Sequence, residues 1–209
     1  MIPLGHALNF YLKYPNEMGY FGYDDEERDV SWLGKGDQKA FLAECEKVCD
    51  QAWADFRRLA EAMCTEMGDK LTGLDMKTTP HTKNDNWQWS LDFWPSGKRP
   101  KTLKSRVGVY VETAAEGKVV AYPWVWVRGG RRKEDALRKI LGVTAAQWSC
   151  EFQSGTVPIA RIVLGPQKSD RDASPLLDAI MAPLLALKKT QWNQVWKLAT
   201  SETKVSDQS

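Results

Sequence analysis

The stretch from Asp37 to Met67 constrains the fold most, because its apolar residues recur at steps of three and four positions along its whole length. That spacing places them on one stripe of a single helix. Asp37 suits the N-cap, and Gly68 suits the position just after the last turn. A helix of about 31 residues is about 46 Å long, so it has to pack against something broad. The stripe consists of Phe41, Leu42, Cys45, Val48, Cys49, Ala52, Phe56, Leu59, Ala60, Met63 and Met67.

A sheet is the broad partner that the rest of the sequence predicts. Residues 86–94, 106–113 and 118–128 alternate with a period of two and are rich in Val, Tyr and Trp, which is typical of strands. The second and third segments are joined by the short sequence AAEGK, which favours a hairpin. Two further strands are expected near 148–153 and at 157–164.

Two shorter helical segments complete the pattern. The sequence RRKEDALRKILG predicts a helix over 131–142 that ends at Gly142. The last helix begins at Ser174 with Pro175 in its first turn, and Pro183 inside it predicts a kink or a break. The order α-β-β-β-α-β-β-α therefore predicts an α+β fold with a mostly antiparallel five-stranded sheet. We expect the long helix to cross one face and the last helix to cover an edge or the second face.

The chain is predicted to form one domain with two flanking segments. We expect residues 1–35 to be an irregular N-terminal arm packed on the core, residues 36–199 to be a single α+β domain, and residues 200–209 to be a disordered tail. The first residues lack the pattern of a secretory signal, and no apolar run approaches the roughly 18 residues of a membrane span. A cytoplasmic protein that does not bind membranes is the resulting expectation.

The four cysteines do not predict a disulfide framework or a metal site. Cys45, Cys49 and Cys64 fall on one predicted helix, and Cys150 lies far along the chain. Cys64 would be about 22 Å from Cys49 along that helix, so no set completes a tetrahedral zinc site. We expect free, buried thiols and no bound metal.

Charge is distributed unevenly along the chain. Residues 1–86 hold 16 acidic and 10 basic residues, whereas residues 87–209 hold 11 acidic and 19 basic residues. The first part is therefore net −6 and the second net +8, although the whole chain is only +2. A basic half is the electrostatic footprint of a phosphate-rich partner, and an acidic half suits a basic protein surface or the chain's own basic half.

Tryptophan-rich strands run into basic segments twice. The sequence NWQWSLDFWP (86–95) precedes a basic loop, and the sequence AYPWVWV (121–127) precedes RGGRRK (128–133). The predicted basic surface consists of Lys98, Arg99, Lys101, Lys104, Arg106, Arg128, Arg131, Arg132 and Lys133. The cations of the loop, Lys98, Arg99, Lys101, Lys104 and Arg106, are expected to be exposed and neutral for folding. The second group of cations lies at a helix N-terminus, which favours a phosphate or a carboxylate; the alternative is a solvated face.

The alternation of the strands assigns the aromatic side chains to faces. Trp87 and Trp89 fall on a face that is plainly core. In the segment 118–128 neither face is polar, because Tyr122, Trp124 and Trp126 lie opposite the valines. That second aromatic face is either covered by the N-terminal arm or the last helix, or it is a binding surface that stacks on bases or forms a protein interface.

Catalytic and cofactor motifs are not found in the sequence. His6 and His81 form no dyad pattern, GKGDQK (34–39) lacks the Walker spacing, and no GxGxxG follows a strand. No cofactor is therefore expected, and the chain leans away from enzymes. Asp92 followed by Glu116-Gly117-Lys118 resembles the D…ExK pattern of restriction-type nucleases, which would make Asp92, Glu116 and Lys118 a metal-dependent catalytic set. The predicted turn position of Glu116 does not favour it, since such acids have to meet on adjacent strands.

A non-enzymatic binding protein is the leading functional expectation, with a metal-dependent nuclease as the alternative. The partner is expected to be nucleic acid itself or a protein complex that handles nucleic acid. A small phage or mobile-element regulator or inhibitor of a bacterial defence complex would fit this description. The acidic run is either a solvated loop or a phosphate mimic that opposes a basic groove; it consists of Asp24, Asp25, Glu26, Glu27 and Asp29.

Overall fold

The computed structural model describes residues 4–15, 34–81, 88–97, 99–114, 117–144, 152–168 and 172–201. Within these ranges it has an antiparallel sheet in the order β1-β2-β3-β4-β5, and β6 also pairs with β4. The elements are α1 (His6–Lys13), α3 (Lys35–Thr72), β1 (Met76–Pro80), β2 (Gln88–Pro95), β3 (Ser105–Thr113), β4 (Val119–Val127), α4 (Arg131–Leu141), β5 (Thr156–Pro158), β6 (Ile162–Val163), α5 (Ser174–Leu185) and α6 (Lys189–Thr200). The predicted α+β class, the antiparallel sheet and the long helix are confirmed.

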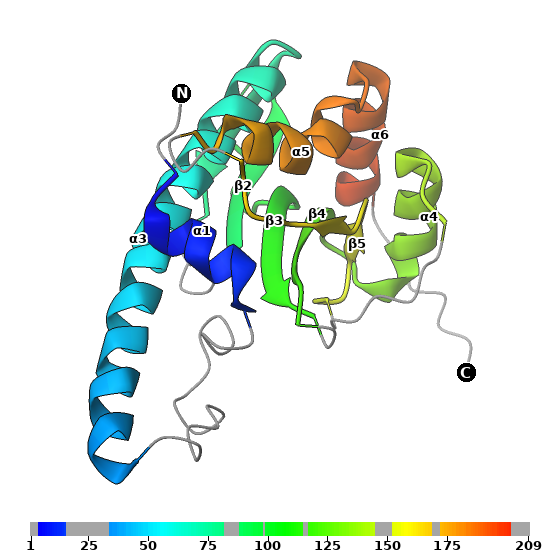
Figure 1. The fold of residues 1–209 in the computed structure, drawn as a ribbon. Helices are drawn as coiled ribbons and strands as arrows, with labels where there is room; N and C mark the ends of the chain where they lie inside the picture. The colour runs from blue at the N-terminus through cyan, green and yellow to red at the C-terminus, as the bar shows by residue number, and fades with distance from the viewer. Residues whose placement is uncertain are drawn as a thin grey trace, which may run out of the picture.

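One face of the sheet is covered by the long helix and by the two C-terminal helices (Figure 1). Trp89 on β2 is fully buried and donates its indole N–H to the sulfur of Met63 on α3, at 2.7 Å. Phe93, on the same face of β2, meets Trp192 of α6 edge to face with ring centroids 5.3 Å apart. The prediction that the last helix covers an edge or the second face is therefore wrong, because β2 presents its core side chains to α3 and α6 together.

The long helix differs from its predicted bounds at the C-terminal end. It continues through Gly68 to Thr72, and Gly73 is its C-cap. A Cβ atom at residue 68 would lie 3.7 Å from the hydroxyl oxygen of Thr78, on β1. Gly68 therefore lies where the helix passes close to β1, and does not end the helix.

The observed strands differ from the predicted ones in two places. β1 was not expected, since MKTTP has no apolar alternation; it forms by pairing with β2, from Met76 opposite Pro95 to Pro80 opposite Leu91. The predicted strand 157–164 is instead the two short strands β5 and β6. Residues 145–151, which carry most of the strand predicted near 148–153, lie outside the described residues.

The N-terminal arm and the last helix also differ from expectation. Residues 6–13 form α1, which buries Ala7, Leu8, Tyr11 and Leu12 against the core, where irregular chain was predicted. The last helix is broken into α5 and α6 at residues 186–188, three positions after Pro183. Pro183 itself lies inside α5. Its missing N–H affects the hydrogen bond to residue 179, on the N-terminal side, so Pro183 does not by itself account for a break that follows it.

The cysteines of the described residues are free thiols. Cys45 is buried, and Cys49 and Cys64 are half-buried. Burial, and to a lesser degree the charge of Glu61, raise the pKa of Cys64 to about 11. That thiol is consequently protonated at neutral pH and unreactive. Cys150 lies outside the described residues.

Candidate functional site

The two basic segments of the sequence meet at one end of the sheet. Ser105, the first residue of β3, pairs with Val127, the last residue of β4. Next to this pair the backbone N–H of Arg128 donates to the carbonyl of Lys104 at 2.8 Å. We call this surface the basic end; it consists of the exposed side chains of Arg99, Lys101, Arg128, Arg131 and Arg132 together with half-buried Lys104. Lys98 lies outside the described residues.

A glycine turn directs the second basic segment into α4. Gly129 and Gly130 have φ angles of 132° and 64°, which favour glycine. Gly130 is the N-cap residue of α4, where no side chain caps the helix. Arg131 and Arg132 are therefore in the first turn, beside backbone N–H groups that favour an anion.

Lys133 is not part of this surface, although the sequence predicted that it would be. Its side chain is buried, and its ammonium group donates to the carbonyls of Leu198 at 2.6 Å and Ser201 at 2.9 Å, in the last turn and C-cap of α6. The stem of Lys133 fills the space beside Gly129, where a Cβ atom would lie 2.7 Å from it. Its position on the inner side of α4 turns it toward α6 and away from solvent.

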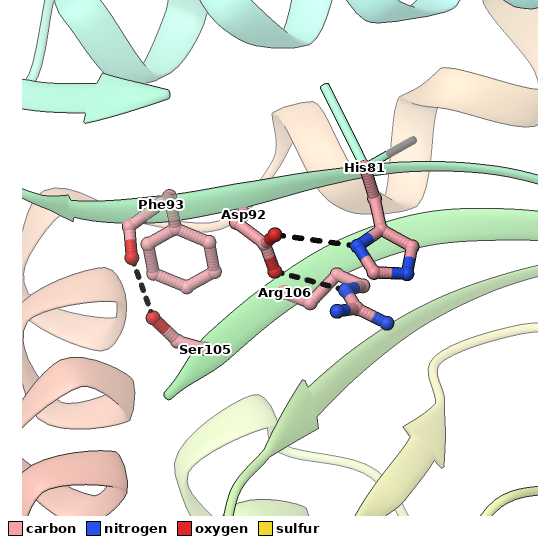
Figure 2. Close-up of polar contacts among 5 residues, drawn as sticks. All are labelled: His81, Asp92, Phe93, Ser105 and Arg106. Carbon is pink, nitrogen blue, oxygen red and sulfur yellow. Dashed lines mark hydrogen bonds and ion pairs between the residues drawn. The ribbon is translucent and has the colours of Figure 1, made fainter. Parts of the chain in front are cut away.

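Arg106 is not the exposed cation without effect on folding that the sequence predicts. It is the second residue of β3, and its Nε donates to Oδ1 of Asp92 at 2.9 Å (Figure 2). The other carboxylate oxygen of Asp92 lies 3.4 Å from Nδ1 of His81. The Asp92 side chain is 4% exposed and that of Arg106 is 18% exposed. Such a partly buried pair matters for folding, which an exposed loop cation would not.

Two arginines, one on β3 and one in the segment between β2 and β3, lie over tryptophan rings of the sheet. The guanidinium carbon of Arg106 is 5.3 Å from the ring centroid of Trp126, its cross-strand partner on β4. At the neighbouring strand the guanidinium carbon of Arg99 is 5.6 Å from the ring centroid of Trp94. Cation–π contacts of this kind fix the orientation of the guanidinium plane.

The second aromatic face is largely covered. Within the described residues the cover is the segment that contains Phe152 and Ser154, whereas the sequence predicts the N-terminal arm or the last helix. Tyr122 is fully buried and its ring meets Phe152 edge to face at 5.6 Å. Trp124 is 3% exposed, and its indole fills the space beside Gly108. Trp126 is half-buried and donates its indole N–H to the carbonyl of Ser154 at 3.2 Å.

A small cavity remains open on this face. It has a volume of about 190 Å³ and reaches the surface at the exposed residue Gln153. Sequence reasoning found Arg106, Trp124 and Trp126, and missed the remaining residues of the wall. The alternation of β3 places Tyr110 on this face, whereas nothing local in the sequence indicates Phe152. The lining residues are Arg106, Tyr110, Trp124, Trp126, Phe152, Gln153 and Thr156.

Two of the three proposed nuclease residues, Asp92 and Lys118, lie far apart along the sheet. Asp92 pairs across strands with Arg106 near the start of β3, whereas Lys118 follows the hairpin beyond its far end. Lys118 lies opposite Ala114, eight residues beyond Arg106, so the two are about 26 Å apart along the strand. Glu116 lies outside the described residues, as do the acidic run 24–29 and Trp87. Within the described ranges, no three His, Cys, Asp or Glu side chains are grouped to hold a metal ion.

A larger groove, of about 920 Å³, lies between α1 and the first half of α3, away from the basic end. Its walls carry both signs of charge, including Lys13, Glu44 and Arg58. Asp55 is 2% exposed there and lies against Gly5, where a Cβ atom would lie 1.6 Å from its carboxylate. Oδ1 of Asp55 also lies 3.5 Å from Nη1 of Arg58.

Comparison with protein-family models, with curated proteins and with solved structures finds no match for the chain. Among the helices of the described residues, none combines the length and the apolar character needed to span a membrane.

Proposed function

We propose that this protein is a non-enzymatic binding protein whose ligand is a single strand of nucleic acid, held at the basic end. The observation that carries the proposal is the meeting of two basic segments, about 25 residues apart in the sequence, at the hydrogen bond between Arg128 and Lys104. Five exposed cations and one half-buried cation thereby share one end of the sheet. Clustered lysine and arginine side chains are the footprint of a polyphosphate backbone.

The surroundings of the basic end favour an unpaired strand. Arg99 and Arg106 lie over Trp94 and Trp126, and half-buried Trp126 adjoins a cavity lined by rings. Proteins that bind single strands combine a basic track for the backbone with aromatic side chains for the bases. A duplex keeps its bases stacked inside the double helix, so it would contact the cations and not the aromatic side chains.

Charge reversal at the start of α4 tests this proposal. The double variant Arg131→Glu, Arg132→Glu should weaken binding of single-stranded DNA and RNA and reduce the salt dependence of the binding constant. Each lost phosphate contact lowers the logarithmic salt slope by about 0.7. Acidic residues in the first turn are favourable to the helix dipole, so the variant should unfold at the same temperature as the parent protein or slightly higher.

The matched control is Lys39→Glu, Lys168→Glu, which makes the same charge change at two exposed lysines outside the basic end. It should bind nearly as the parent protein does. Equal weakening by both double variants would show that only net charge matters. No measurable binding of either polymer by the parent protein would overturn the proposal. If a partner then persists after nuclease treatment and is lost only in the Arg131→Glu, Arg132→Glu variant, the basic end docks a protein complex instead.

A further inference from the structure

We propose that the cavity beside Arg106 seats one guanine base of the bound strand, with the terminal amino groups of Arg106 donating to O6 and N7 of the base. This inference rests on the proposed function, since it names the base that the strand inserts. The cavity is lined by Arg106 and four aromatic side chains. It is therefore built for a flat ring that carries hydrogen-bond acceptors.

Arg106 is held in place from two sides. Its Nε donates to buried Asp92 at 2.9 Å, and its guanidinium carbon lies 5.3 Å from the ring centroid of Trp126. Within the described part of the chain, no acceptor takes a hydrogen bond from its two terminal nitrogens. Figure 2 shows these nitrogens on the side of the guanidinium away from Asp92. A guanidinium fixed in this way offers a rigid pair of donors to a ligand.

The size of the cavity suits one base better than a larger ligand. Its volume of about 190 Å³ is below the roughly 300 Å³ at which pockets for whole small-molecule ligands begin. Half-buried Tyr110, Trp126 and Phe152 supply ring surfaces. Stacking on aromatic side chains is the usual way in which proteins hold an unpaired base.

The phosphates of the same strand would find the basic end next to the cavity. The wall at residues 153–156 touches the start of α4, because Glu134 accepts a hydrogen bond from the N–H of Gly155 at 2.9 Å. Gly155 in turn accepts from the N–H of Val127 at 3.0 Å, one residue before Arg128. The wall of the cavity therefore lies next to the end of β4 and the first turns of α4, the segment that carries Arg128, Arg131 and Arg132.

Guanine is favoured by the donor character of Arg106. The guanidinium has only donors, so it needs two neighbouring acceptors. Guanine offers O6 and N7, and the pairing of arginine with these atoms is the commonest specific contact to a base. Adenine presents an amino group beside N7, which would oppose a second donor from Arg106.

The test uses the unaltered protein and short oligoadenylates that carry one substituted position. A strand with one guanine should bind about tenfold or more tightly than the same strand with adenine or cytosine. Inosine keeps O6 and N7 and should bind as guanine does, whereas 7-deazaguanine lacks N7 and should lose most of the gain. Equal binding of all these strands would overturn the guanine site while leaving the proposed function intact. A preference that survives in 7-deazaguanine, or a preference for cytosine, would also overturn it.

Two matched variants complete the test. Arg106→Lys keeps the charge and loses the paired donors, so the ratio of the affinity for the guanine strand to that for the adenine strand should fall to about one. Arg99→Lys makes the same change at the other arginine that lies over a tryptophan, outside the cavity lining, and should keep the preference. Loss of the preference in both variants, or in neither, would contradict the role of Arg106. Failure of the parent protein to bind any strand would instead count against the proposed function.

Discussion

The ammonium nitrogen of Lys133 lies 2.6 Å from the carbonyl oxygen of Leu198 and so joins the first turn of α4 to the last turn of α6. A cation at a helix C-terminus interacts favourably with the helix dipole and with carbonyls that have no partner inside the helix. Burial, and to a lesser degree the charge of Lys104, lower the pKa of Lys133 from its ordinary value of 10.5. The contact holds α4, and with it Arg131 and Arg132, in place against the helical layer.

Replacing Lys133 with Met should therefore destabilise the protein. Methionine keeps much of the apolar stem but removes the donor to the carbonyl of Ser201 and leaves the carbonyl of Leu198 with only the hydroxyl of Ser201, at 2.8 Å. This loss should cost about 1–3 kcal/mol in the free energy of unfolding. Urea denaturation measures this loss. The neighbouring exposed residue gives the control: Arg132→Met should change stability by no more than about 0.5 kcal/mol. Equal effects at both positions would contradict the role of Lys133.

The pH dependence of the same variant has a definite sign. Because the pKa of Lys133 is lowered in the folded state, the unfolded chain holds this proton more tightly, and folding gains free energy as the pH rises toward 10.5. The free energy of unfolding of the parent protein, relative to that of Lys133→Met, should thus increase as the pH is raised from 7 toward 10.5. Urea denaturation of both proteins over this range measures the difference. A difference that shrinks with pH would mean that the folded state raises the pKa instead.

Trp89 should be one of the largest single contributors to the core. It is fully buried and hydrogen-bonded to the sulfur of Met63. Trp89→Ala should therefore cost about 3–5 kcal/mol in the free energy of unfolding. Trp126→Ala is the comparison, because this ring is half-buried and should cost less. Calorimetric or chemical unfolding that ranks the two variants in the opposite order would contradict this assignment. The same cost predicted from the sequence for Trp87 concerns a residue outside the described ranges.

Gly108 should tolerate no side chain. A Cβ atom there would lie 2.4 Å from the carbonyl oxygen of Trp89 and 2.6 Å from Cζ2 of Trp124, and the first of these is backbone. Gly108→Ala should therefore destabilise the protein by about 1–3 kcal/mol through overpacking. Gly165→Ala, where no atom lies within 4 Å of the added carbon, should be nearly neutral. Thermal unfolding compares the two, and similar melting temperatures would show that Trp124 moves aside at little cost.

The pair of Asp92 and Arg106 should behave as a structural unit. Asp92→Ala leaves a partly buried guanidinium without its carboxylate and should cost about 3 kcal/mol. In the Arg106→Met background the same change should cost much less, because no charge is then left unpaired. A double-mutant cycle measures the coupling. The exposed pair of Glu44 and Lys47, 3.6 Å apart, should show a coupling below about 1 kcal/mol. Additive effects at Asp92 and Arg106 would contradict the structural role.

The sequence by itself determined the elements that repeat with a local period. The three- and four-residue steps after Asp37 predicted α3, and the alternation of residues 106–113 and 118–128 predicted β3 and β4 within one residue of their observed ends. It also identified Trp89 as core and both segments that form the basic end. These predictions succeed because helix and strand periods are set by backbone geometry within a few residues.

The tertiary structure alone decided which of these residues act together. β1 forms without a local signal, because β2 offers it a pairing edge. Lys133 and Arg132 are adjacent in sequence and both carry a positive charge, yet α6 takes only Lys133 into the interior. Arg106 leaves the predicted surface because Asp92 lies opposite it, and Phe152 forms a cavity wall from a segment about 40 residues beyond Tyr110. Charge and aromatic content are properties of single residues, whereas pairing and burial depend on partners far along the chain, and those partners are fixed only when the sheet and its helices pack.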